Sequence, residues 1–509
     1  MAIDSRVVDH AADPFLATLA LVGVVIVIAA LLSGLIERSG APQVAVLLGL
    51  GAVLGPYGLG LIDTRLDSPV LRAVGILSLA LVLFTDALSL SITEIRRKLR
   101  LTLLVVGPGT LLSAVLITLA ARGILGLSWP AAAILGAALA STDPVLLRGL
   151  LRRPDLPGEA RLALRLESGL NDIVLLPIVL VAMVFLAQRG ATEASWSKMG
   201  LQLFLLGPGA GVAVGLLGVA TLDLIRRRLG IRRDYESLYS LGLCFAAYAA
   251  AEFLHGSGFL SAFAAGMTIS ILDVELCDCF KEYGETTAEM ALLLTFVLLG
   301  NSLIWTGVTV ADGSVLLFAF VALLIRPVVV LISLKPVCLD RRSLALIAWF
   351  GPRGLSSLLI VLLPVFAGMP GSPRLFSLCC LVVLLSVLIH GGSLMLLGRR
   401  AAAPAAAPVP VAIPVESGFV AGEPPQTVID RGEPAAPEVV IPEQITLDEL
   451  RALRERGEPV VILDARSHRS LENSDLTAEG AIRLDPDRTV KEAERLQLPK
   501  EAWLVAFCA

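Results

Sequence analysis

Three short polar motifs interrupt long apolar stretches of this sequence. They are Ser141-Thr142-Asp143-Pro144, the run Glu167–Asp172 (Glu-Ser-Gly-Leu-Asn-Asp) and the run Gly351–Ser357 (Gly-Pro-Arg-Gly-Leu-Ser-Ser). Carboxylates, hydroxyl groups and backbone carbonyls are the oxygen ligands that small hard cations prefer. A carboxylate in apolar surroundings is costly unless a cation or a proton accompanies it. The chemistry that these motifs favour is therefore reversible binding of a cation or a proton.

The second motif places its polar side chains on shared faces of a helix. Glu167 and Asn171 are four residues apart, as are Ser168 and Asp172, and residues at this spacing lie one above the other. Asp172 has no cation next to it in the sequence. We therefore take Asp172 as the main functional candidate.

The other two motifs predict breaks in their helices. Pro144 and Pro352 each remove a backbone donor and clash with the preceding turn. A broken helix exposes carbonyls and dipole ends that can bind ions or balance charge. Asp143 has two interpretations, as a cap on the following half-helix or as part of the ion site. Arg353 is a candidate structural partner for Glu167, since a buried charge needs a counter-charge.

The composition indicates that these motifs lie inside a membrane. The 509 residues are 56% hydrophobic and only 17% charged, with a mean hydropathy of +0.81. The formal net charge of −4 gives no basic field, which argues against a nucleic-acid partner. A spanning helix needs about 20 mostly apolar residues, and thirteen such segments are predicted. The segments are 15–37, 42–57, 69–89, 101–121, 129–150, 160–187, 200–225, 236–254, 257–273, 287–305, 313–334, 342–366 and 374–397.

The thirteen segments predict two inverted six-helix repeats joined by the segment at 200–225. The two broken segments, 129–150 and 342–366, are then the fifth members of the two repeats. Interrupted helices at matching positions are a sequence sign of an ion site in a transporter. The expected fold is therefore an all-α membrane protein with two discontinuous, crossed helices and a small α/β tail.

Basic loop residues predict the orientation of the chain. They follow the third, fifth, seventh, eleventh and thirteenth segments, which places those loops and the C-terminus in the cytoplasm and the N-terminus outside. The expected location is the plasma (inner) membrane. The basic set comprises Arg96, Arg97, Lys98, Arg100, Arg148, Arg152, Arg153, Arg161, Arg226, Arg227, Arg228, Arg232, Arg233, Lys335, Arg341, Arg342, Arg399 and Arg400.

The motifs resemble those of a known transporter family. Leu-Glu-Ser-Gly-Leu-Asn-Asp, ending at Asp172, is similar to the Asn-Asp motif of sodium/proton antiporters in the monovalent cation:proton antiporter-1 family. The segments 141–145 and 351–357 resemble that family's two crossed, unwound helices, and residues 256–260 and 264–266 also match its pattern. The resemblance covers about residues 15–397.

The resemblance implies roles for individual residues. Asp172 would bind the monovalent cation and the proton in turn, with Asp143, Thr142 and Ser168 as additional groups of the cation site. Asn171 would help to hold the arrangement, and Glu167 would form a structural ion pair with Arg353. The family resemblance also implies a homodimer, a core domain that slides against a dimerisation domain, and electroneutral exchange of Na⁺ or another monovalent cation for H⁺. No cofactor is expected.

The C-terminal part has a different composition. We divide the chain into a transmembrane domain (1–400), an Ala/Pro-rich linker (401–442) and a tail (443–509). Ile445–Leu450, Val461–Arg466 and Gly480–Ile482 resemble the start of a rhodanese-like domain, with Cys508 at its vestigial catalytic position. The chain given stops at Ala509, without a loop to hold the sulfur, so the resemblance implies an inactive module.

Three alternatives stay open at the level of sequence. The transported cation could be K⁺ in place of Na⁺, because selectivity depends on cavity size and ligand number. A passive cation channel could line a pore with the same acidic residues. A membrane-tethered sulfurtransferase would use the tail. The broken helices favour the antiporter, so we do not expect an enzyme.

Overall fold

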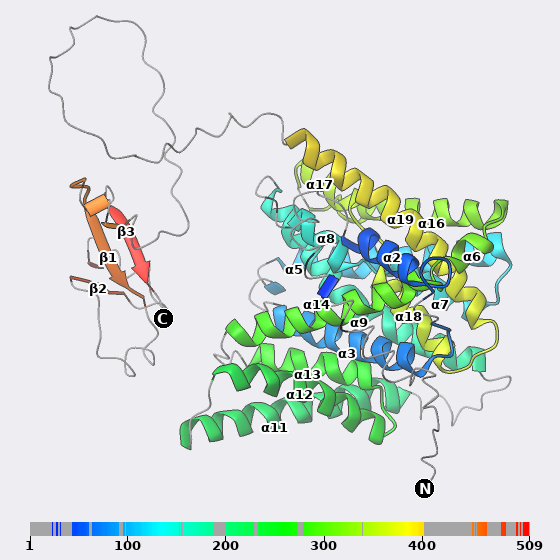
Figure 1. Ribbon diagram of the computed structural model, residues 1–509, viewed down its shortest axis with the longest axis horizontal. Helices are drawn as coiled ribbons and strands as arrows, with labels where there is room; N and C mark the ends of the chain where they lie inside the picture. The colour runs from blue at the N-terminus through cyan, green and yellow to red at the C-terminus, as the bar shows by residue number, and fades with distance from the viewer. Residues whose placement is uncertain are drawn as a thin grey trace, which may run out of the picture. The chain divides into compact units, whose positions relative to one another are not determined.

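The structure is a computed structural model that describes most of the helical part and a small portion of the tail. The described ranges are 43–60, 64–90, 98–151, 156–187, 200–228, 233–272, 278–337, 339–401, 456–465, 480–484 and 502–507, with a few isolated residues besides. The chain divides into two compact units, Met1–Val409 and Pro410–Ala509. The first unit is helical and carries all three polar motifs (Figure 1).

One set of helices in the first unit forms what we call the scaffold group. In Figure 1, α11, α12 and α13 lie side by side, and α13 packs on α3, which in turn contacts α14. The short helix α15 (Thr306–Thr309) follows α14, and the π-helical turn η2 (Leu201–Leu206) precedes α11. The group consists of α2 (Gln43–Leu54), α3 (Pro69–Ser89), α11 (Gly207–Arg228), α12 (Arg233–Phe253), α13 (Gly258–Ile271) and α14 (Asp278–Asn301).

The remaining helices form what we call the crossing group, because it contains both broken helices. Here α7 packs on α6 and α9, α16 packs on α6 and α17, and α18 packs on α19 and α7. The group consists of α5 (Leu99–Leu104), η1 (Val105–Leu112), α6 (Ser113–Leu125), α7 (Trp129–Ala140), α8 (Pro144–Leu151), α9 (Gly158–Ala187), α16 (Gly313–Ser333), α17 (Arg341–Trp349), α18 (Leu355–Phe366) and α19 (Ser372–Ala401).

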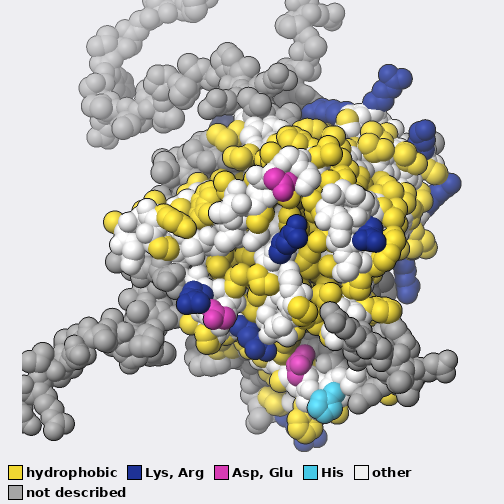
Figure 2. Space-filling model, turned by 90° about the vertical axis from the view of Figure 1, so that its right-hand side faces the viewer, with side chains coloured by type: hydrophobic (Ala, Val, Ile, Leu, Met, Phe, Trp, Pro, Cys, Tyr) yellow, Lys and Arg dark blue, Asp and Glu magenta, His cyan; other side chains and the backbone are white. Residues whose placement is uncertain are grey.

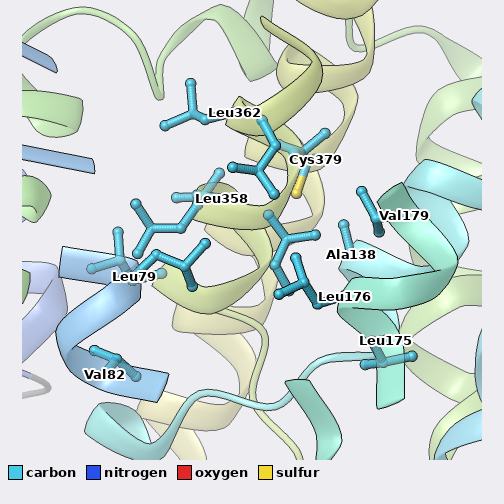
Figure 3. Packing of buried hydrophobic residues seen from close by; sticks show 14 of the residues in the cluster. Leu79, Val82, Ala138, Leu175, Leu176, Val179, Leu358, Leu362 and Cys379 are labelled. Atoms are coloured by element: carbon cyan, nitrogen blue, oxygen red, sulfur yellow. The ribbon is translucent and has the colours of Figure 1, made fainter. Parts of the chain in front are cut away.

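Apolar side chains account for both the surface and the core of this unit. Seven helices among the described residues are long and apolar enough to cross a membrane, and further apolar helices are shorter. Hydrophobic side chains cover most of the face shown in Figure 2. Inside, Leu358 and Leu362 of α18 lie between Leu79 of α3 and Leu176 of α9 (Figure 3). The second half of one broken helix is therefore buried on two sides.

Both breaks occur where the sequence predicts them. The helix that starts at Trp129 ends at Ala140, Ser141 has extended dihedrals (φ −63°, ψ 139°), and Pro144 starts α8. Proline fits the first position of a helix, since the backbone donor that it lacks has no partner there. In the same way α17 ends at Trp349, and Gly351-Pro352 separates it from α18.

The predicted fold class is confirmed, with one part outside the described residues. The described helices match the predicted segments from 42–57 onward, and the two discontinuous helices are present. The first predicted segment, 15–37, lies almost wholly outside the described residues, so the count of thirteen stays a prediction. The sequence did not indicate the π-helical turns η1 and η2; Pro108 lies inside η1 and Pro208 follows η2. Each proline lacks the backbone N–H that would continue the i→i−4 pattern.

The second unit contains a small parallel sheet. Strand β1 (Val460–Asp464) lies between β2 (Ile482–Arg483) and β3 (Trp503–Phe507), so the strand order is β2-β1-β3. These strands agree with the small α/β tail expected from the sequence. Cys508 and the linker 402–442 lie outside the described residues, and the rhodanese-like assignment stays a prediction.

Candidate functional site

The two broken helices touch at their unwound segments. The backbone N–H of Asp143 donates to the carbonyl of Pro352 at 3.0 Å. The backbone N–H of Arg353 donates to Oγ of Ser386 in α19 at 2.7 Å, and His390 hydrogen-bonds the same Ser386. These bonds satisfy buried backbone groups that the helix breaks would otherwise leave without partners. The crossing is therefore a fixed backbone arrangement and not a loose loop.

Asp143 caps two half-helices with one carboxylate. Its Oδ1 accepts from the backbone N–H of Val145 at 2.8 Å, and its Oδ2 accepts from the backbone N–H of Leu355 at 2.6 Å. Val145 lies in the first turn of α8 and Leu355 is the first residue of α18. A negative charge is stabilised at helix N-termini, where backbone donors are free. The capping interpretation of Asp143 is confirmed, and it holds for both broken helices.

Two glycines allow these close approaches. A Cβ at position 354 would collide with Oδ2 of Asp143, and a Cβ at position 351 would collide with the guanidinium of Arg326. Any larger residue would push the charged group away from the backbone that it contacts. The glycines of the third motif are therefore required by the packing of charged groups against the unwound segment.

The positively charged Arg353 side chain lies at the C-terminal end of α7. Its guanidinium donates from one nitrogen to the carbonyls of Ala140 (2.7 Å) and Ser141 (2.9 Å), at the C-terminal end of that half-helix. Cations are favourable at helix C-termini, where carbonyls lack intrahelical partners. The other terminal nitrogen of Arg353 is buried and has no hydrogen-bond partner in the structure.

Glu167 forms its ion pair with Arg326, which corrects the predicted pair with Arg353. Both carboxylate oxygens of Glu167 accept from the Arg326 guanidinium, at 2.8 and 2.6 Å. Arg326 also donates to the carbonyls of Ile347 and Ala348 at the end of α17. A planar guanidinium matches a carboxylate with two parallel bonds, and Arg353 is already engaged by the end of α7.

Asp172 is held by the Ser141 hydroxyl. Ser141 donates from Oγ to Oδ1 of Asp172 at 2.5 Å, and the buried Ser356 side chain in the first turn of α18 lies close to this carboxyl group. Asp172 is 3% exposed. The two hydroxyls come from the end of α7 and the start of α18, whereas Asp172 comes from α9. Three elements therefore converge on one carboxyl group.

The other predicted site residues, Asn171, Thr142 and Ser168, form hydrogen bonds with described residues other than Asp172. Asn171 donates from Nδ2 to Oγ1 of Thr142 at 2.7 Å and, at 3.3 Å, to the carbonyl of the same residue. Oδ1 of Asn171 is buried without a partner in the structure. Ser168 is buried and donates to the carbonyl of Arg165 in its own helix. The structure therefore brings Asn171 and Thr142 together at the crossing, whereas Ser168 lies one helical turn before Asp172 in α9.

The charges at the crossing leave one negative charge in excess. Among the described residues of the helical unit, the buried Asp, Glu, Lys and Arg side chains are Asp143, Glu167, Asp172, Arg326 and Arg353, and His390 is also buried. With these five ionised and His390 neutral, the sum is −1. Glu167 is paired with an arginine and Asp143 with two helix N-termini, whereas within the described part of the chain Asp172 receives a hydrogen bond from the Ser141 hydroxyl. The unbalanced charge therefore belongs to Asp172, where one proton or one monovalent cation would neutralise it.

Sequence reasoning missed the roles of Ser141, Ser356 and Arg326. Both serines stand inside the motifs, but an unwound segment has no periodicity that tells which side chain faces the carboxylate. For Arg326, nothing near it in the sequence indicates which residue neutralises its charge. Its position in the middle of an apolar span was the available signal, because such a charge needs an opposite one.

Comparisons with known proteins identify the family of this chain. Residues 24–400 match the family model described as sodium/hydrogen exchanger, transmembrane. The chain is 26% identical over 409 residues to the K(+)/H(+) antiporter NhaP of Alkalimonas amylolytica, covering 79% of this chain and 68% of that protein. It is 30% identical over 395 residues to the K(+)/H(+) antiporter NhaP2 of Shewanella sp. (strain ANA-3), covering 74% and 65%.

The chain thus spans about two thirds of the length of these curated relatives. A solved structure, that of the sodium proton antiporter MjNhaP1 from Methanocaldococcus jannaschii at pH 8, shares the fold with a TM-score of 0.61 at 19% sequence identity. That match covers 75% of this chain and 100% of the other. The family model matches most of the length of this chain, and the fold of the solved antiporter agrees with that match. This chain therefore belongs to the sodium/hydrogen exchanger family of multi-pass membrane proteins.

Proposed function

We propose that this protein exchanges a monovalent cation for a proton, and that both bind at Asp172. The observation that carries the proposal is the buried carboxyl group of Asp172, which the Ser141 hydroxyl holds without a counter-charge at the crossing of two broken helices. Because the crossing has an excess of one negative charge, one monovalent cation or one proton neutralises it. Competition for that charge gives exchange without a cofactor, and a one-for-one ratio makes the exchange electroneutral.

The other residues of the motifs support this site in the proposal. Asp143, Thr142 and Ser168 surround the cation-binding region, and Asn171 orients Thr142 through its amide. Alternating access follows from movement of the crossing group against the scaffold group. Their contact includes apolar packing, as between Leu79 of α3 and Leu358 of α18 (Figure 3), and apolar side chains can slide without breaking hydrogen bonds.

The cation is Na⁺ or K⁺ in this proposal. The family name refers to sodium, whereas the two curated relatives are named as potassium/proton antiporters. We also propose a homodimer in the plasma (inner) membrane, with the N-terminus outside and the C-terminus in the cytoplasm. The basic residues after odd-numbered spans support this orientation, and the family resemblance supports the dimer.

Ion flux in vesicles tests the exchange directly. The purified full chain is reconstituted into liposomes with an imposed pH gradient, and NaCl, KCl, LiCl or choline chloride is added outside. Exchange predicts that one or more alkali cations dissipate the gradient, that choline does not, and that clamping the membrane potential leaves the rate unchanged. Cation flux without proton counterflow would contradict the proposal and favour the channel.

A further inference from the structure

We infer that the Ser141 and Ser356 hydroxyls are cation ligands that determine specificity at Asp172. This inference rests on the proposed exchange function and adds two residues that the sequence motifs did not single out. In the structure the Ser141 hydroxyl donates to the Asp172 carboxylate at 2.5 Å, and the Ser356 side chain lies close to the same group. Both serines are buried, at 0% and 5% exposure.

The chemistry of a hydroxyl group suits both states of the site. A serine hydroxyl has one proton to donate and two lone pairs to offer. Without a cation, it donates to the carboxylate, as the structure shows for Ser141. When a cation reaches Asp172, rotation about the Cβ–Oγ bond turns the proton away and presents a lone pair to the cation. Asp172 and the two serines then supply hard oxygen ligands from three elements.

The backbone around each serine is held in place, which makes the spacing of the two hydroxyls selective. The carbonyl of Ser141 accepts from Arg353, and the residue before Ser356 donates its N–H to Asp143. The bond from Asp143 to the carbonyl of Pro352 joins the two segments. Ligands on a fixed frame fit one cation radius better than another. We therefore assign discrimination among alkali cations to this serine pair.

The test uses substitutions that change the oxygen and preserve the shape. Ser141→Cys and Ser356→Cys keep the volume but replace a hard oxygen by a soft sulfur, which hard alkali cations bind poorly and soft cations such as Tl⁺ bind well. Ser141→Ala and Ser356→Ala remove the ligand. Ser261→Ala is the matched control, because this buried hydroxyl donates to the carbonyl of Ala247 within the scaffold group.

Each full-length variant is measured in two ways. Proton flux in vesicles gives KM and the maximal rate for Na⁺, K⁺ and Tl⁺, and cation-dependent thermal stabilisation in detergent reports binding without transport. Each alanine variant should raise KM for the preferred alkali cation about tenfold, with the maximal rate largely kept and the thermal stabilisation reduced. Each cysteine variant should show the same loss for alkali cations but keep Tl⁺ binding, and Ser261→Ala should match the wild type.

The possible outcomes separate the inference from the function that it rests on. If the wild type shows no cation-coupled proton flux, the proposed exchange fails. If the wild type exchanges but folded Ser141 and Ser356 variants keep their KM values and their preference among cations, the serine assignment alone is overturned. Equal losses for alkali cations and Tl⁺ in the cysteine variants would also overturn it, because they would indicate structural damage and not a change of ligand.

Discussion

At the scale of single residues, the pair of Glu167 and Arg326 secures the crossing. Arg326 makes two bonds to Glu167 and two to carbonyls at the end of α17. Arg326→Gln should destabilise the protein by about 3–5 kcal/mol, because it leaves Glu167 buried without a counter-charge. The double variant Glu167→Gln/Arg326→Gln should recover part of this loss in a thermal melt in detergent.

Arg353 provides the comparison for this pair. A double-mutant cycle of Glu167 with Arg353 should give a smaller coupling energy than the cycle with Arg326, because Arg353 bonds the end of α7. Stronger coupling to Arg353 would mean that the ion pair is the one expected from the sequence and that the observed contact is not the stabilising one.

The types of the site residues could be predicted from the sequence, but most of their partners could not. Charged residues stand out in apolar spans, so Asp143, Glu167, Asp172 and Arg353 were all identified. The partner of Glu167 lies 159 residues away in the sequence, and no local pattern joins the two. The cap of Asp143 on Val145 is local and is one of the two interpretations that the sequence offers, whereas its bond to Leu355 depends on how the helices cross.

At the scale of elements, one ion pair links the two helix groups. Arg148 in α8 forms an ion pair with Glu289 in α14, and both side chains are partly exposed. If α8 moves with the crossing group during exchange, this pair must break and re-form. Glu289→Lys should therefore change the initial rate of exchange severalfold without altering the preference among cations, and the swap Arg148→Glu/Glu289→Arg should restore the rate.

The ion pair of Lys98 and Glu159 is the matched control for this prediction. It joins the start of α5 to α9 within the crossing group, with similar partial exposure. Reversing it with Glu159→Lys should leave the exchange rate near that of the wild type. A rate unaffected by Glu289→Lys, or affected equally by both reversals, would show that the Arg148–Glu289 contact does not report movement between the groups.

The N-terminus of α16 carries a pH-dependent cap outside the membrane-spanning segment. Asp312 accepts from the backbone N–H of Val315 at 2.8 Å, and this bond lowers the pKa of Asp312 below its ordinary value. Because the folded-state pKa is depressed, the stabilisation is present above the unfolded pKa and is lost as the pH falls through the folded value. The difference in melting temperature between wild type and Asp312→Ala should therefore shrink on acidification. A difference independent of pH would exclude a contribution from the ionised cap.

The positions of the elements were largely predictable, since length and hydropathy specify spanning helices and prolines specify breaks. The grouping of the helices was not, because helices that are apolar all round can pack in many ways. The close contacts at Gly351 and Gly354 indicate what decides the crossing. These contacts depend on side chains from α16 and from the other broken helix, which sequence spacing alone does not bring together.

At the scale of the whole molecule, the helical unit and the tail are separate bodies. All three motifs lie within Met1–Val409, and Pro410–Ala509 forms its own unit. We predict that deleting 401–509 leaves cation-driven proton flux intact and changes at most its regulation. The measurement is flux in vesicles at matched protein density. A truncated protein that inserts and melts normally but cannot exchange ions would make the tail part of the transport machinery.

The central claim is that the unbalanced buried charge at the crossing, on Asp172, serves both the cation and the proton. Asp172→Asn keeps the size and most hydrogen bonding of the side chain but cannot ionise, so it offers no negative charge to a cation and no site for a proton. The measurement is alkali-driven proton flux in vesicles, across pH and up to saturating salt, with folding checked by thermal melting. The account predicts no exchange in either direction under any of these conditions. Near-normal maximal flux in a well-folded Asp172→Asn protein would contradict it and leave Asp143 as the carboxyl group to test.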